Sequence, residues 1–199
     1  MPRILLVYHR PGRPSSISYV ERLQAMLRGL GIEAETATIE EAQALRPGRP
    51  LFLLMFTRGG HWRSLVDAGH EPLLVPASLF ANAAAREAKA RWGDCSGLAL
   101  AALRAKRLRE EQMEDLERIR LLLELHCPGA SLHVMDTMGE PGPAEEPVAP
   151  LAFLPGRLSR SACGRTSRCL GAFAEYALED TAAWIADTAW RLATSRQGI

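Results

Sequence analysis

The chain has 199 residues, of which 47% are hydrophobic and 24% charged, and its formal net charge at pH 7 is +1. This length and composition are typical of a globular protein with one domain or two small halves that share a core. The balanced charge argues against a protein that binds a nucleic-acid backbone, and no apolar run approaches the ~20 residues of a membrane helix. The start lacks the pattern of a signal peptide, so we predict a cytoplasmic protein.

Hydrophobic periodicity divides the first half of the chain into alternating strands and helices. Residues 3–9 (RILLVYH) form a nearly continuous apolar run, typical of a central parallel strand that is buried on both faces. A helix follows, with Ser15 or Ser16 as its cap and Gly31 at its end. The next elements are predicted as a strand at 32–39, a short helix at 40–45, a strand at 51–56, a short helix or loop at 63–69, a strand at 72–80 and a helix at 81–92. This order is that of a parallel sheet with helices on its faces.

The second half of the sequence resembles a weaker copy of the first. PLAFL at 150–154 matches PLFLL at 50–54. The dipeptide Gly156–Arg157 then corresponds to Gly60–His61, with four residues fewer in between. The other elements of this half are predicted as a strand at 97–103, a helix at about 105–126, a strand at 132–137, a surface loop at 139–150 and a closing helix with core aromatics at 173–193.

This internal similarity predicts the domain organisation. Residues 97–103 suit a helix as well as a strand, and the pattern leaves that choice open. The predicted fold class is α/β, with two similar halves at 1–95 and 96–199. Each half would be a small parallel sheet flanked by helices, and the halves would face each other across a cleft.

Two histidines follow predicted strands of the first half. His9 ends the first strand, and His61 comes after the third strand, directly behind Gly59 and Gly60. If these parallel strands are neighbours, both imidazoles lie in the same crevice, because carboxyl ends of parallel strands meet at one edge of a sheet. Such a pair could bind a divalent ion such as Co²⁺, Fe²⁺ or Ni²⁺, or accept protons from a substrate. The matching places in the second half hold Leu103 and Arg157.

Arginines surround both histidines in the sequence, at Arg10, Arg13, Arg58 and Arg63, and the matching loop of the second half has Arg157 and Arg160. These are either solvated loop charges or a basic rim that binds several carboxylates through guanidinium forks. Asp67 could orient an imidazole, accept a proton or cap a helix. His70 is predicted to be solvated, and His126 and His133 to be structural.

The cysteines and glycines give no sign of a common cofactor site. Cys95, Cys127, Cys163 and Cys169 lack the spacing of a zinc site, and we predict reduced, structural thiols, with a cluster or redox role as the less favoured alternative. Neither common glycine-rich phosphate loop is present, so no nucleotide cofactor is expected. The segment at 10–16 (RPGRPSS) nevertheless leaves the first helix start open to an anion.

The strand that ends in His9 and the later PLFL…GGH segment resemble the class II tetrapyrrole chelatases, in particular the sirohydrochlorin cobaltochelatases. The resemblance covers residues 3–80 and, more faintly, 97–160. It implies a flat macrocycle held between two α/β halves. It also implies that His9 and His61 bind the metal and take up the protons displaced from the pyrrole nitrogens. The family usually has glycine directly after the first histidine, where this chain has Arg10.

The resemblance implies a lyase of cobalamin or siroheme biosynthesis that inserts Co²⁺, or alternatively Fe²⁺ or Ni²⁺, into sirohydrochlorin. The substrate carboxylates would then contact the rim formed by Arg10, Arg13, Arg58, Arg63 and Arg157, with Gly59 and Gly60 beneath the disc. Two other functions stay open: a non-catalytic carrier of metal or tetrapyrrole, and a Rossmann-like module that binds a nucleotide. The expected partners are the metal and the macrocycle, without nucleic acid or membrane, in a monomer or homodimer.

Overall fold

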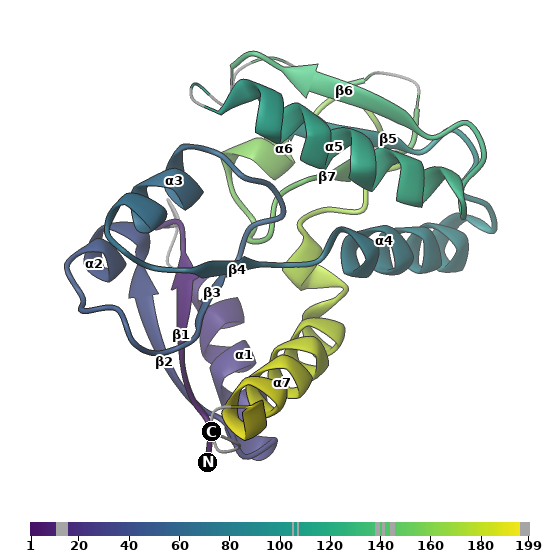
Figure 1. Ribbon diagram of the computed structural model, residues 1–199. Helices are drawn as coiled ribbons and strands as arrows, with labels where there is room; N and C mark the ends of the chain where they lie inside the picture. The colour runs from purple at the N-terminus through teal and green to yellow at the C-terminus, as the bar shows by residue number, and fades with distance from the viewer. Residues whose placement is uncertain are drawn as a thin grey trace.

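The computed structural model describes residues 1–10, 16–104, 106, 108–137, 140, 142–143 and 146–195. It contains two parallel sheets, one in each half of the chain, and helices lie against both of them (Figure 1). No helix in these described ranges combines the length and apolar character needed to cross a membrane.

The first half contains β1 (Arg3–Tyr8), α1 (Ile17–Gly29), β2 (Glu33–Thr38), α2 (Ile39–Gln43), β3 (Leu51–Leu53), α3 (Gly60–Asp67), β4 (Pro72–Leu74) and α4 (Ala77–Trp92). The strands are parallel in the order β2-β1-β3-β4. Ile4 and Leu6 of the central strand belong to the same buried cluster as the inner face of α1. Leu5 and Val7 belong to a second cluster with Leu65 of α3. The strand is therefore buried on both faces, as its apolar run predicts.

Two strands of this sheet end earlier than predicted, and each has a local cause. After β3 the N–H of Met55 turns back to the carbonyl of Leu53 at 2.7 Å, so this N–H no longer joins the ladder, although the carbonyl of Met55 still accepts a bond from Val75 at 2.9 Å. After β4, Pro76 has no N–H for a ladder bond, and its φ of −61° suits the residue that precedes a helix. Residues 77–80, predicted as the end of a strand, therefore form the first turn of α4.

The second half contains β5 (Ala99–Leu103), α5 (Arg109–Glu124), β6 (Ser131–Met135), β7 (Val148–Pro150), α6 (Arg157–Cys163), the 3-10 helix η2 (Phe173–Glu175) and α7 (Leu178–Ser195). Its parallel strands have the order β6-β5-β7. The sequence left helix or strand open at 97–103, and the structure has a strand there, β5. Residues 148–150, predicted as the end of a surface loop, form β7 instead. Trp190, predicted as a core anchor, is 46% exposed on α7.

Ladder hydrogen bonds determine which residues of the two halves are equivalent. The carbonyl of Pro50 accepts a bond from β1 at 2.9 Å, and the carbonyl of Pro147 accepts the same bond from β5 at 2.8 Å. The N–H groups of Leu54 and Leu151 then bond back to β1 and β5. Residues 147–151 are therefore equivalent to 50–54, and the predicted match to 150–154 is wrong. This half has prolines at 147 and 150, and the sequence pattern alone does not show which one opens the strand.

The corrected correspondence continues without a gap to β4. Gly59 caps α3 with φ −173° and ψ −166°, and Gly156 caps α6 with φ −168° and ψ −161°. Pro72 pairs with β3, and Cys169 forms an isolated parallel bridge with β7 at the same place. Residues 50–72 thus correspond one to one to residues 147–169. Consequently Leu158, not Arg157, takes the place of His61, and Arg157 takes the place of Gly60.

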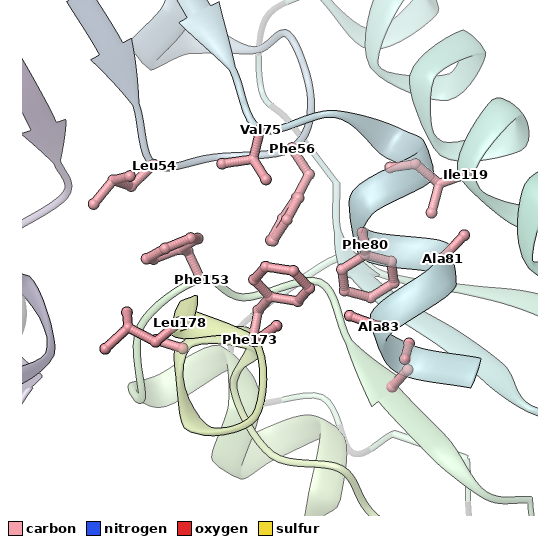
Figure 2. Packing of buried hydrophobic residues seen from close by; sticks show 14 of the residues in the cluster. Leu54, Phe56, Val75, Phe80, Ala81, Ala83, Ile119, Phe153, Phe173 and Leu178 are labelled. Atoms are coloured by element: carbon pink, nitrogen blue, oxygen red, sulfur yellow. The ribbon is translucent and has the colours of Figure 1, made fainter. Parts of the chain in front are cut away.

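Equivalent side chains meet in the core between the halves. Phe56 and Phe153 occupy matching positions, and their ring centroids are 6.1 Å apart. Phe173 lies against both rings, at 5.0 and 5.9 Å, and Phe80 completes the group (Figure 2). A residue that contacts its own counterpart is typical of two units related by a twofold axis. The two halves therefore share one hydrophobic core, although the predicted boundary between residues 95 and 96 stays a prediction.

All four cysteines form disulfides, so the prediction of reduced thiols is wrong. Cys95 bonds to Cys127, and Cys163 bonds to Cys169, with Cα atoms 5.0 and 5.4 Å apart. These separations lie within the reach of a disulfide, which the linear spacing of the cysteines does not reveal. The second disulfide joins the end of α6 to the residue that bridges to β7.

Candidate functional site

The structure brings the two predicted histidines together. Because β1 and β3 are hydrogen-bonded neighbours, the residues that follow them reach the same edge of the sheet. His9 comes directly after β1, and His61 is the second residue of α3. Their ring centroids are 4.9 Å apart, with an angle of 60° between the ring planes. The topological argument from the sequence therefore leads to an actual pair of imidazoles.

The position of His61 follows from the way α3 begins. The chain reaches Gly59 in an extended conformation, and the carbonyl of Gly59 accepts the first helical bond from Arg63 at 2.9 Å. Leu65 on the inner face of the helix is fully buried, and Trp62 packs against the same cluster. These contacts fix the rotation of the helix, so that His61 points its ring toward His9.

The environment of His61 favours a neutral imidazole. The ring is half-buried, and burial lowers the pKa of His61 below its ordinary value. The neighbouring His9 lowers this pKa further, whereas the carboxylate of Glu40 partly offsets both effects. The start of a helix also disfavours a positive charge at this place. A neutral imidazole has a free lone pair on one ring nitrogen, which is the form that binds a metal or accepts a proton.

Our sequence reasoning missed Glu40, whose carboxylate raises the pKa of His61. Glu40 is the second residue of α2, directly after β2, and β2 is the other neighbour of β1. The carboxyl ends of parallel strands meet at one edge of the sheet, so strand order groups Glu40 with the two histidines. The described residues nevertheless contain no group of three His, Cys, Asp or Glu side chains close enough to hold a metal ion. Among the described residues, the two imidazoles are therefore without a third ligand-type side chain beside them.

Arg58, predicted to bind substrate, links the loop before α3 to the second half. Its Nη2 lies 2.9 Å from Oδ1 of Asp115 and 3.1 Å from Oε2 of Glu114, both on α5. Its main-chain N–H also donates to Asp115 at 2.7 Å. The hydrogen bond to Asp115 is the main reason that the pKa of Arg58 is raised. This ion pair anchors the loop between β3 and α3, and therefore the start of the helix that carries His61.

The other predicted arginines differ in their surroundings. Arg63 forms an ion pair with Asp67 at 2.9 Å, so Asp67 neutralises a neighbour on α3 rather than orienting an imidazole. Arg10 and Arg157 are exposed, whereas Arg13 lies outside the described residues.

The loop before α6 touches the first half close to the site. The hydroxyl of Ser16 donates to the carbonyl of Pro155 at 2.7 Å. Ser16 lies just before α1, in the connection that follows His9, and Pro155 is two residues before Arg157. The bond therefore ties the start of α6 to the first half near the end of β1.

The remaining histidines lie outside the pair. His70 is 6% exposed, and its Nε2 is 2.9 Å from the carbonyl oxygen of Ala42, so the prediction of a solvated side chain is wrong. The turn after α3 folds back onto α2, which the local sequence does not reveal. His126 is exposed after α5, and His133 on β6 has a buried Nε2 without a partner among the described residues.

Comparison with known proteins identifies the fold. No protein-family model matches the sequence, and no curated protein is significantly similar to it. The solved structure of CbiX, "the terminal enzyme for biosynthesis of siroheme in denitrifying bacteria", aligns with a TM-score of 0.65 at 17% identity, covering 97% of this chain and 99% of CbiX. A structure of the XylFII–LytSN complex aligns with a TM-score of 0.31 at 12% identity, which is too low to support any argument. The chain thus has the α/β fold of CbiX over nearly its whole length, as the resemblance to chelatases predicts.

Proposed function

We propose that this protein is a metal chelatase that inserts a divalent ion into sirohydrochlorin. The observation that supports the proposal most directly is the pair of imidazoles, 4.9 Å apart at the carboxyl edge of a parallel sheet. The similarity of the fold to that of CbiX agrees with this reaction class. Among the candidate metals we favour Co²⁺ because the sequence resembles the sirohydrochlorin cobaltochelatases, and Fe²⁺ and Ni²⁺ are the alternatives because they also accept imidazole ligands.

The histidines can serve the reaction in two successive roles. Neutral His9 and His61 would first bind the incoming ion through one ring nitrogen each. With only two protein ligands, the ion keeps coordination positions for the pyrrole nitrogens of the macrocycle. As the ion moves to those nitrogens, each imidazole regains its lone pair and can accept one of the protons that the pyrroles lose. The exchange balances, because one divalent ion enters the macrocycle for every two protons that leave it.

The charges around the pair would support both steps. The carboxylate of Glu40 raises the pKa of His61, and it would therefore stabilise the imidazolium that forms after proton transfer. For the substrate carboxylates we assign the rim to the exposed Arg10 and Arg157, together with Arg13 from the sequence. Arg58 and Arg63 already hold carboxylates of this chain. Gly59 and Gly60 would lie beneath the disc, next to His61.

The same geometry supports a chelatase more than a carrier of metal. A protein that stores an ion usually surrounds it with several ligands, as structural metal sites do. In the described part of the chain no third ligand-type side chain joins the two imidazoles. An ion held by two neutral ligands can be passed on, which favours transfer over storage.

Insertion of Co²⁺ into sirohydrochlorin, followed by the change in absorbance, tests the proposal. We expect the purified protein to accelerate insertion, and His61→Ala or His9→Ala to lower the rate by about 10²-fold or more, the usual contribution of a positioned acid–base group. His126→Ala is the matched control, because His126 is exposed and lies outside the pair. Unchanged rates in both site variants would disprove the assignment. Tight binding of the macrocycle without turnover would instead identify a carrier.

A further inference from the structure

Gly60 and Arg157 occupy the same backbone position in the two halves. Each is the first residue of its helix, α3 or α6, and the preceding glycines have nearly the same φ and ψ. The ladder correspondence of residues 50–72 with 147–169 gives the same pairing independently of the helix ends. The second half thus shows that this backbone accepts a full-length side chain at that position.

Nothing in the fold requires glycine at position 60. Its φ is not among the positive values that favour glycine. A Cβ atom built on Gly60 would have no heavy atom within 4 Å, so no neighbouring group needs the space. Glycine is also a poor helix former compared with alanine. Packing and backbone conformation therefore do not explain the glycine at position 60.

Gly60 directly precedes His61 at the start of α3, so we take the open space above Gly60 to adjoin the imidazole pair. A hydrated ion can reach two imidazoles through a narrow opening. A rigid macrocycle must instead lie flat over the bound ion to present its pyrrole nitrogens, and its rim then extends well beyond the ion. A side chain that projects from position 60 would block the disc but would leave the ion's approach free.

We propose that Gly60 is the specificity-determining residue that admits a flat macrocycle to the imidazole pair. This inference rests on the proposed function, because it assumes that the macrocycle meets the ion at His9 and His61. The inference assigns metal binding and access of the macrocycle to different residues of the site. The histidines determine whether a metal binds, and the missing side chain at position 60 determines whether a disc can reach that metal.

The test compares two ligands in Gly60→Leu, which adds uncharged bulk of the kind that Arg157 shows to be tolerated. We expect the Kd for sirohydrochlorin, measured by quenching of tryptophan fluorescence, to rise about tenfold or more. The Kd for Co²⁺ alone, measured by calorimetry, should stay within about twofold of wild type, and the urea midpoint should not fall. Gly29→Leu is the matched control, because Gly29 is also helical, lacks a positive φ and has open space around a built Cβ.

Each outcome has a distinct meaning. Wild-type affinity of Gly60→Leu for sirohydrochlorin would overturn the inference and leave the proposed chelatase standing. Loss of Co²⁺ binding or a lowered urea midpoint in Gly60→Leu would also overturn it, because Gly60 would then be needed for the pair or for the fold. Failure of the wild-type protein to bind sirohydrochlorin would overturn the proposed function and this inference together.

Discussion

The two halves of the molecule have the same framework but different side chains at the site. The register of β1 with β3 and of β5 with β7 places Leu103 where the first half has His9, as predicted. The gapless correspondence places Leu158 where it has His61. Both leucines pack against a small apolar cluster on the α6 side of the second sheet. The imidazole pair is thus confined to one half, and the other half uses the same positions to extend its core.

The largest effect is expected from making the second half resemble the first. The double variant Leu103→His/Leu158→His should create a second imidazole pair, and calorimetry should then detect two Co²⁺ ions per chain, against the one ion that we expect for wild type. The change should also lower the free energy of unfolding by about 2 to 4 kcal/mol, because two apolar contacts are replaced by polar rings. Unchanged Co²⁺ stoichiometry in a folded variant would show that a similar backbone is not enough to give the second half an equivalent metal site.

An intermediate effect is expected from the ion pair that joins the halves. Arg58→Ala removes the partner of Asp115, whose side chain is only 20% exposed, and should lower the free energy of unfolding by about 1 to 3 kcal/mol. Arg63→Ala breaks a far more exposed pair on α3 and should cost no more than about 0.5 kcal/mol. Urea unfolding of both variants measures the difference. Equal losses would mean that the link between the halves is no stronger than an ordinary surface pair.

The smallest effect is expected from the titration of His61. Its counterpart in the second half, Leu158, has no titratable group. The pKa of His61 in the folded protein is lowered, so the unfolded chain binds the proton more readily. The contribution of this group to stability is complete above the unfolded pKa of about 6.5 and is lost as the pH falls below that value. The wild-type protein should therefore lose slightly more stability between pH 7 and pH 5 than His61→Leu does. Parallel pH profiles of the two proteins would contradict the lowered pKa.

The sequence predicted the imidazole pair because the argument needed only strand order. The sequence-based prediction failed where a short apolar pattern fitted two strand registers equally well. Pro147 and Pro150 offered two registers for one strand, and the wrong choice displaced the counterpart of His61 by one residue. The burial of His70 and the disulfide of Cys163 depend on contacts between segments that local patterns do not report. Glu40 was missed because we applied the strand-end argument to histidines alone.

The contact between Phe56 and Phe153 has a consequence for how such a molecule can change. Each ring is part of the surface that the other one fits, so neither half can alter this position without disturbing its partner. Phe56 also lies two residues before Arg58, in the loop that leads to α3. Substitutions at this contact would therefore affect the position of the imidazole pair. The second half has leucines in place of the two histidines, yet its shape at this contact is constrained by the half that carries the imidazole pair.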